Sequence, residues 1–387
     1  MTLLRSERFA AILLVLAAVL ALILANTAAG PTVRAIESFT LGFGPLELSV
    51  GHWVKDGLLA IFFFIAAIEL RHELRHGELN SARKALVPTV AAVGGVVVPA
   101  VIFLLIVQGD PDLVQGWPIP TATDIAFALG VLAIVGRGLP PTFRALLLAI
   151  AVIDDLIAIL IIAAFFTTDL LPLPLLISIP VVLIFGWLSY RLKAKKRAAW
   201  IIPLMIVLGL TAWVLVYLAG IHPTIAGVAL GLIMADGAAR PTRHAIEPWS
   251  NVIILPLFAL VAALVPIPNE NIADLSPAFW GVIVALPIGK IIGITAGAWI
   301  AMSLADRKDR TQRLPLSNVV AVAALGGIGF TVSLLMNELA FEDQRLIADE
   351  VTLGVLIGSV IAALIGGSLT AYLSRGYRQR AALLKDS

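Results

Sequence analysis

The chain has 387 residues, of which 60% are hydrophobic and 13% are charged, and its mean hydropathy is +1.01. A soluble globule of this composition would have too little polar surface to stay dissolved, so the composition excludes the soluble classes and indicates a helical membrane protein. The absence of cysteine excludes disulfides, thiol catalysis and cysteine-ligated metal, and in a membrane protein the net charge of +2 bears on topology rather than on nucleic-acid binding.

Long apolar stretches recur along the whole chain. Residues 85–107 carry no charge, and this length exceeds the roughly 20 apolar residues that cross a bilayer as a helix. Residues 198–235 also lack Asp, Glu, Lys and Arg but are too long for one span, so Gly220 and Pro223 predict a turn between two spans. We therefore predict an all-α polytopic protein with twelve transmembrane helices, at residues 9–25, 57–68, 85–107, 119–135, 145–166, 172–190, 200–218, 221–235, 248–266, 278–303, 316–336 and 351–373.

The first span and the loop after it each carry a local signal. Residues 1–30 resemble a signal peptide, because Arg5 and Arg8 precede an apolar stretch that ends in small residues. Cleavage would leave an odd number of spans, so we expect an uncleaved first helix. Residues 39–50 alternate around Gly42, Gly44 and Pro45, which fits a small external β-hairpin and equally an irregular loop.

The basic residues test the predicted topology independently. With twelve spans, all but four of the 27 lysines and arginines fall on one side of the membrane or in the terminal segments of that side. The four exceptions are Arg34, Lys55 and Arg345, on the other side, and Lys290, inside a span. The positive-inside rule then predicts that both termini are cytoplasmic.

Four charged residues lie within apolar spans, where charge is costly. Asp124, Asp154, Asp155 and Lys290 each have long uncharged flanks on at least one side. A charge near the middle of a bilayer costs roughly 2.5–3.5 kcal/mol unless it is paired or hydrated. One acid and Lys290 would suffice for a structural ion pair, whereas three acids exceed that need. We therefore predict a functional site.

The adjacent aspartates predict a division of roles. Neighbouring residues on a helix point about 100° apart, so Asp154 and Asp155 cannot chelate one ion equally. One can face a hydrated cavity while the other reaches a partner such as Lys290. Such carboxylates can hold a proton or a small hard cation, and competition between the two ligands is the simplest mechanism of exchange.

Two spans contain sequence that breaks a helix. Pro118 and Pro120 lie shortly before Asp124, and Gly326, Gly327 and Gly329 interrupt a later apolar run. Paired interrupted spans are the sequence pointer to a transporter site built from half-helices. Asp124 and the hydroxyls of Thr121 and Thr123 could neutralise the helix ends and free carbonyls at such breaks. Separately, Gly289, Gly293 and Gly297 would let the Lys290 helix pack closely on a neighbour.

Several strings together resemble the NhaA family of sodium/proton antiporters. They are Thr-Ala-Thr-Asp-Ile-Ala-Phe-Ala-Leu-Gly around Asp124, Ala-Val-Ile-Asp-Asp-Leu around Asp155, Gly-Lys at Lys290, and Gly-Ile-Gly-Phe-Thr-Val-Ser from Gly327. The resemblance extends over nearly the whole chain, including residues 62–73 and the run from Pro248. It implies a secondary active antiporter, not an enzyme, that moves cytoplasmic sodium or lithium outward against two entering protons. It further implies electrogenic, pH-regulated transport in the inner membrane of a prokaryote.

The resemblance also implies an architecture. Spans three to five, residues 85–168, and spans ten to twelve, residues 278–387, would form inverted repeats whose broken helices cross. Residues 1–84, with the hairpin, and residues 169–277 would form an interface domain, and the hairpin would join two protomers of a homodimer. The expected partners are sodium or lithium, protons and the lipid bilayer, with no nucleic acid and no cofactor.

Individual residues receive roles by the same resemblance. Asp155 would be the principal carboxylate for cation and proton, Asp154 would pair with Lys290, and Asp124 and Thr123 would lie at the helix crossing. The positions associated with pH response are His222, Glu69, Glu73, His72 and Arg243. His72 stands where the family often has arginine and Arg243 where an acid is common, so the pH-sensing cluster is altered while the transport core is intact.

Three other classes of protein deserve comparison with an exchanger. An intramembrane aspartyl protease would need a Gly-x-Gly-Asp string, which the chain lacks. A sodium-coupled solute symporter could share the broken helices and would differ from an exchanger by moving an organic substrate. We keep it as the alternative function. A channel could use the acids for selectivity, but a buried lysine would oppose simple conduction. With no nucleotide-binding loop, the expected energy source is an ion gradient.

Overall fold

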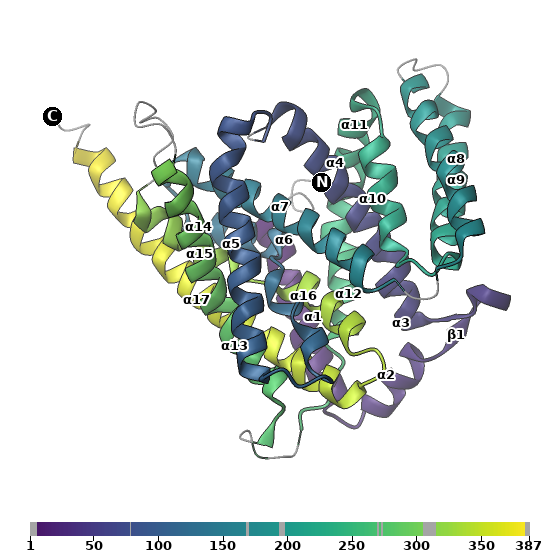
Figure 1. Cartoon of the computed structure of the whole chain (residues 1–387), viewed down its shortest axis with the longest axis horizontal. Coiled ribbons are helices and arrows are strands. Elements are labelled where there is room, and N and C mark those ends of the chain that lie inside the picture. The colour runs from purple at the N-terminus through teal and green to yellow at the C-terminus, as the bar shows by residue number, and fades with distance from the viewer. Residues whose placement is uncertain are drawn as a thin grey trace. The chain divides into compact units, whose positions relative to one another are not determined.

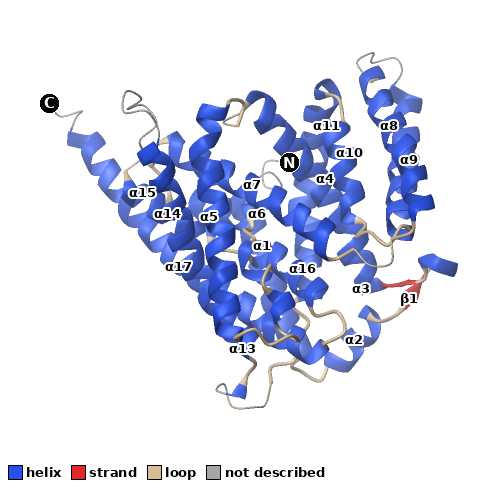
Figure 2. Ribbon diagram, in the orientation of Figure 1, coloured by secondary structure: helices blue, strands red, loops and turns tan. Residues whose placement is uncertain are grey.

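The computed structural model describes residues 6–77, 79–167, 170–192, 198–268, 271, 274–304 and 315–383. Figure 2 shows that nearly all of this chain is helical, with one small pair of strands. The basic residues predicted at Arg5, in 193–197, in 307–313 and at Lys385 lie outside the described residues.

The chain folds into two compact units. Unit 1 comprises Met1–Leu16, Glu78–Ala158 and Val265–Ser387, and unit 2 comprises Ala17–Gly77 and Ile159–Leu264. Helices α1 (Glu7–Ala25) and α7 (Pro141–Phe165) each contribute residues to both units. The other helices of unit 1 are α5 (Ala82–Val107), α6 (Ile125–Val135), α13 (Pro277–Val284), α14 (Lys290–Leu304), α15 (Leu316–Gly326), α16 (Phe330–Ala340) and α17 (Arg345–Leu383).

The first helical break in unit 1 lies before Asp124. Two short 3-10 turns, Val114–Gly116 and Ile119–Thr121, lead into extended backbone at Ala122, and α6 begins at Ile125. Proline lacks the N–H that a continuing helix needs, so Pro118 and Pro120 account for the interruption. The predicted break in this span is confirmed.

The second break separates α15 from α16. The two helices meet at a bend of 48° across Gly327, Ile328 and Gly329. Gly327 packs against backbone, because a Cβ there would lie 3.1 Å from the carbonyl oxygen of Leu286. The break predicted from the three glycines is also confirmed.

Helix α14 packs tightly on α5, and the two lie side by side in Figure 1. A Cβ on Gly293 would lie 2.1 Å from the carbonyl oxygen of Gly94, so only glycine permits this approach. The predicted close packing of the Lys290 helix is confirmed. A π-helical turn, Ala285–Gly289, joins α13 to α14 directly before Lys290, and such turns are frequent at functional sites.

Unit 2 is built mainly from helices α4 (Leu59–His76), α8 (Pro172–Arg191), α9 (Ala198–Leu218), α10 (Thr224–Ile233), α11 (Asp236–Trp249) and α12 (Leu255–Ala262), with short helices α2 (Gly30–Glu37) and α3 (Val50–His52). Two π-helical turns, Trp53–Leu58 and Ser250–Ile254, lead into α4 and α12. Its core includes Ile68, Phe185, Ile201 and Met205, which bury apolar faces of α4, α8 and α9 together.

The predicted hairpin forms in unit 2. Strand β1 (Thr40–Leu41) pairs antiparallel with β2 (Leu48–Ser49), and the 3-10 turn Gly44–Leu46 lies between them. Gly42 and Gly44 both have positive φ angles, +123° and +60°, that favour glycine. The hairpin interpretation of residues 39–50, rather than the irregular loop, is therefore confirmed.

Several helices are longer than the apolar runs that predicted them. Helix α11 begins at Asp236, so Arg240 and Arg243 lie on a helix and not in the predicted loop. Ala238 and Ala239 bury one face of this polar segment while its charged residues pair on the other, so hydropathy alone missed it. Among the described residues, nine helices are long and apolar enough to cross a membrane, or ten spans if α15 and α16 count as one.

Candidate functional site

Lys290 and Asp154 form a fully buried ion pair in unit 1. Lys290 Nζ lies 2.6 Å from Asp154 Oδ2, and both side chains have 0% exposure. Lys290 is the first residue of α14, and Asp154 lies on α7. A charge buried without a partner is strongly destabilising, so the opposite charges of Lys290 and Asp154 offset the unfavourable burial of each other.

Asp155 lies beside this pair without a partner of its own. Its exposure is 4%, and among the described residues neither of its carboxylate oxygens has a hydrogen-bond partner. Asp154 Oδ1 is likewise buried and unbonded within the described part of the chain. Buried polar atoms are normally hydrogen-bonded. Three carboxylate oxygens are thus available to a proton, a water molecule or a cation.

Thr123 connects the ion pair to the second helical break. Its Oγ1 lies 2.8 Å from Asp154 Oδ2 and 2.7 Å from the carbonyl oxygen of Gly326, the last residue of α15. One hydroxyl carries one proton, so Thr123 donates to only one of these acceptors at a time. The protonation of Asp154 and the hydrogen bonding of the Gly326 carbonyl are therefore coupled through one side chain.

Asp124 joins the two breaks. Its Oδ1 accepts the N–H of Phe127 at 2.9 Å, which caps α6, and its Oδ2 accepts the N–H of Thr331 at 3.2 Å near the start of α16. Its own N–H donates to the carbonyl of Ile328 at 2.6 Å. One negative charge thus neutralises the positive ends of two half-helices.

The hydroxyls predicted at the breaks also bond free carbonyls. Thr121 Oγ1 donates to the carbonyl of Pro118 at 2.7 Å, where the helix is interrupted. The roles of Thr331 and Ser333 were missed by the sequence reasoning. Thr331 Oγ1 donates to Asp124 Oδ2 at 2.6 Å, and Ser333 Oγ donates to the carbonyl of Ile119 at 2.7 Å. Both belong to the string that follows Gly327, where hydroxyl residues in an apolar run were the available signal.

The chemistry of this donor set suits a small hard cation. Sodium prefers oxygen ligands, which Asp155 and Asp154 supply. Among the residues that the structure describes, no group of three or more His, Cys, Asp and Glu could hold a resident metal ion.

Most of the proposed pH-response residues lie on one end of α4 and on α11, in unit 2. Arg243 on α11 pairs with Glu69 on α4 and, through Nε at 3.3 Å, with Glu247 Oε2. Glu73 is 8% exposed, and the rings of His72 and His76 stack with centroids 5.5 Å apart.

Two further ion pairs join α4 to α11, and sequence reasoning missed both. Asp236 accepts from Arg71 Nε at 3.1 Å and from Arg75 Nη1 at 2.9 Å. Arg71 also donates to the carbonyl of Leu232. The signal was the position of Asp236, which ends the long uncharged run of residues 198–235. These contacts fasten the polar end of α4 to the start of α11.

His222 lies at the other end of α4. Its Nε2 is 3.3 Å from Asp56 Oδ1, and its Nδ1 is 2.7 Å from Thr224 Oγ1. Asp56 lies in the π-helical turn before α4, and Glu69 lies roughly 15 Å beyond the start of α4, since each α-helical residue rises 1.5 Å. The structure therefore does not bring His222 together with Glu69 and Arg243. Asp56 is a partner that the sequence reasoning did not identify.

Apolar helices, two of them broken, around a buried lysine and three buried aspartates define a multi-pass membrane protein of the ion-coupled secondary transporter class. The family model for sodium/proton antiporter 1 matches residues 1–369. The sodium/proton antiporter NhaA 2 of Clavibacter michiganensis is 50% identical over 390 residues, covering 100% of this chain and 95% of that protein.

Two further relatives agree. The sodium/proton antiporter NhaA of Tropheryma whipplei is 44% identical, covering 98% of this chain and 96% of its own length. The sodium/proton antiporter NhaA 3 of Streptomyces coelicolor is 43% identical, covering 97% of this chain and 80% of its own length. The chain therefore belongs to the NhaA family of sodium/proton antiporters. The resemblance read from the sequence is confirmed, as is the prediction of a transporter and not an enzyme.

Proposed function

We propose that this chain exchanges cytoplasmic sodium or lithium for external protons at Asp155. The observation that carries the proposal is the pair of buried, unbonded Asp155 oxygens beside the Lys290–Asp154 ion pair. A carboxylate anion that carried neither a proton nor a bound cation in this position would be unstable, because burial without a partner disfavours the charged form. A proton or a cation removes that cost, so the two ligands compete for one group.

The neighbouring residues divide the remaining work. Asp154 and Lys290 neutralise each other when sodium is absent, and Asp154 Oδ1 supplies a further oxygen toward the ion. Asp124 and Thr123 hold the two breaks together, because both Asp124 oxygens already accept hydrogen bonds. Two acids and a lysine that change proton occupancy would support the electrogenic exchange of two protons for one cation.

Twelve spans follow if two more helices of unit 2 also cross the membrane. Helix α4 has 18 residues but carries Glu69, Arg71 and Glu73 in its second half. Helix α10 has only 10 residues, or about 15 Å of helix, and α11 begins shortly after it at Asp236. With both counted, residues 85–168 and 278–387 form the inverted repeats, and their broken helices meet at Asp124 and Thr331.

The position in the cell and the assembly belong to the same proposal. Basic residues concentrate in the loops of one side, which supports cytoplasmic termini in the inner membrane of a bacterium. Phe39 and Phe43, on the hairpin, are 61% and 85% exposed. An apolar hairpin of this kind supports a homodimer joined at residues 39–50.

Regulation by pH is proposed at two separate places in unit 2. Glu69, Glu73, His72 and Arg243 lie at one end of α4, and His222 with Asp56 lies at the other. At the first place, the candidate residues are held by the ion pair of Arg243 with Glu69 and by the contact of Arg243 with Glu247. At the second place, the candidate for the response is the His222–Asp56 pair, with Nε2 3.3 Å from Oδ1.

The test is cation-induced dequenching of a pH-sensitive dye in everted vesicles. Vesicles with an acidified interior receive sodium, lithium or potassium from mildly acidic to alkaline pH. Sodium-dependent release of protons, absent without the protein, is the expected result. Proton movement that requires an added organic solute would favour the sodium-coupled symporter, and no response to any cation would contradict the proposal.

A further inference from the structure

Helix α17 is longer than a membrane span requires. It has 39 residues, Arg345–Leu383, whereas about 20 suffice to cross the hydrocarbon core. Its last turns carry Arg375, Arg378 and Arg380, beyond the apolar run. The yellow helix in Figure 1 packs on α13 and α15 as it runs toward the C-terminus. The basic extension therefore lies at the end of unit 1 that the positive-inside pattern marks as cytoplasmic.

The extension holds the end of α6. Ser374 has 0% exposure, and its Oγ donates to the carbonyl of Arg137, two residues after α6 ends. The next residue, Gly138, has a φ of +102°, and a Cβ there would lie 2.6 Å from Arg378 Cγ. The loop thus packs closely against α17.

The same extension holds the start of α15. Asn318 Nδ2 donates to Tyr377 Oη at 2.9 Å. Asn318 is 1% exposed, and its Oδ1 has no hydrogen-bond partner within the described part of the chain. If Asn318 Nδ2 lost the Tyr377 hydroxyl, the buried amide would have a hydrogen-bond partner on neither its oxygen nor its nitrogen, which is destabilising.

Ser374 and Tyr377 are three residues apart and therefore share one face of α17. One helical turn thus binds the ends of both broken spans, α6 through Arg137 and α15 through Asn318. Further along, Ser359 Oγ of the same helix accepts the N–H of Phe330 at 3.0 Å, at the start of α16. A single continuous helix fixes these half-helices relative to one another.

We infer that Ser374, Tyr377 and Asn318 are positioning residues for ion exchange. Together they form what we term the α17 clasp, which keeps the half-helices α6 and α15 in the arrangement that binds the cation. None of the three touches the buried aspartates, and they act by holding the two helices whose inner ends carry Thr123, Asp124 and Gly326. This inference rests on the proposed exchange at Asp155.

The clasp makes a specific kinetic prediction. If only part of the population has both half-helices in place, the apparent affinity for sodium falls by that fraction, while bound sodium is still exchanged. Loss of the Tyr377 hydroxyl should therefore raise the half-saturating sodium concentration about three- to ten-fold, the effect of one hydrogen bond, with little change in the maximal rate. If these residues only stabilised the fold, their loss would instead lower the maximal rate, because less folded protein would be present.

The decisive variants are Tyr377→Phe and Ser374→Ala, each with a matched control on the same helix. Tyr372→Phe removes a hydroxyl from a side chain that is 77% exposed, and Ser368→Ala changes an exposed serine. Sodium titrations in everted vesicles should show a higher half-saturating sodium concentration in both clasp variants and in neither control. Unchanged half-saturation in both clasp variants would overturn the inference.

A double-mutant cycle tests the contact itself. Asn318→Leu and Tyr377→Phe should each raise half-saturation, and the double variant should exceed the larger single effect only slightly, because both remove one interaction. Fully multiplicative effects would mean that the two residues act separately, contrary to the inference.

Hydrogen exchange distinguishes failure of the clasp from failure of the proposed function. If the unmodified protein shows no sodium-dependent proton release, the proposed exchange is wrong. The clasp is then decided by deuterium uptake at residues 130–139 and 315–321. Faster uptake at both segments in Ser374→Ala and Tyr377→Phe, but not in the controls, would support it, and unchanged uptake would overturn it.

Discussion

The carboxylate of Asp124 accepts the hydroxyl of Thr331 at 2.6 Å, a bond between residues 207 positions apart in the chain. Asp124 caps α6 and Thr331 lies in the first turn of α16, so this bond joins the two broken helices at their interruptions. Thr123, the residue before Asp124, connects this junction to the ion pair of Asp154 and Lys290, because its hydroxyl hydrogen-bonds Asp154 Oδ2.

Removing the Thr331 hydroxyl should weaken this junction. Thr331→Val keeps the shape of the side chain but deprives Asp124 Oδ2 of its shorter bond, so we expect a loss of about 1–3 kcal/mol in stability, as for a hydrogen bond to a charged group. Thermal unfolding in detergent measures it. Thr331→Ser restores the hydroxyl and should behave like the unmodified protein; equal melting of all three would show that the bond contributes nothing.

Breaking the buried ion pair on one side should cost more than removing it altogether. Lys290→Met leaves Asp154 buried and unpaired, and we expect a loss of about 3–5 kcal/mol. Adding Asp154→Asn should recover part of that loss, because no uncompensated charge then remains. The two variants and Asp154→Asn alone form a cycle measured by thermal unfolding. Strictly additive losses would contradict the pairing.

The transport core was largely predictable from the sequence because its residues violate the rules of a membrane interior. Asp154, Asp155 and Lys290 stand out as charges within apolar runs, and Pro118 and Pro120 mark the first break by removing backbone donors. Only the structure gives the partners. Nothing in the spacing of residues 31 positions apart indicates that Thr123 contacts Asp154.

Polar helices and hydroxyl ligands were harder to predict. Helix α11 was missed because its first half is polar, and its ion pairs to Arg71 and Arg75 join segments about 160 residues apart. Thr331 and Ser333 are ordinary residues in an apolar helix until their acceptors are known.

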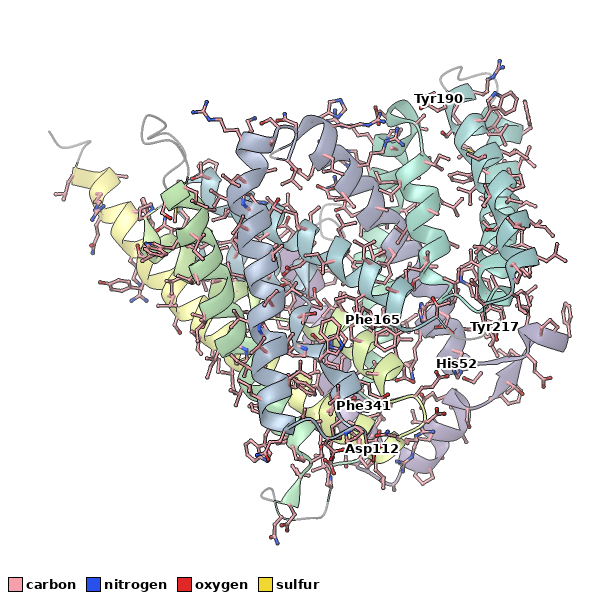
Figure 3. The ribbon with its side chains drawn as sticks, viewed as in Figure 1. His52, Asp112, Phe165, Tyr190, Tyr217 and Phe341 are labelled. Carbon is pink, nitrogen blue, oxygen red and sulfur yellow. The ribbon has the colours of Figure 1, made fainter. Side chains whose placement is uncertain are left out.

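The labelled Asp112 and Phe341 lie at one end of unit 1 in Figure 3. Their segments meet there because Gly116 packs against Phe341, with a Cβ–Cζ distance of 2.7 Å if a side chain were added.

Glycine at position 293 should be required for the α5–α14 packing. Gly293→Ala would place a Cβ 2.1 Å from the carbonyl oxygen of Gly94, and backbone must move to relieve that contact. We expect a loss of roughly 1–3 kcal/mol or failure to assemble, as for overpacking in a core. Gly376→Ala in α17 is the control, because nothing lies within 4 Å of its added Cβ. Similar melting of both variants would contradict the close packing.

His222 should influence the pH at which exchange begins. His222 Nε2 lies 3.3 Å from Asp56 Oδ1, so the charge carried by this side chain acts directly on a neighbouring carboxylate. His222→Gln keeps a polar side chain but removes the ionisable ring, so we expect the activation midpoint to move. The pH profile of sodium-dependent dye dequenching measures the shift. An unmoved midpoint would assign His222 a structural role only.

The central claim is that sodium and protons compete for Asp155, and proton release on sodium binding tests it most directly. Purified protein in weakly buffered detergent solution receives sodium while a pH indicator records released protons. The unmodified protein and the exposed-loop control Asp112→Asn should release protons in proportion to the sodium bound. Asp155→Asn should bind little sodium and release none. Sodium binding without proton release, or equal release from Asp155→Asn, would contradict the account.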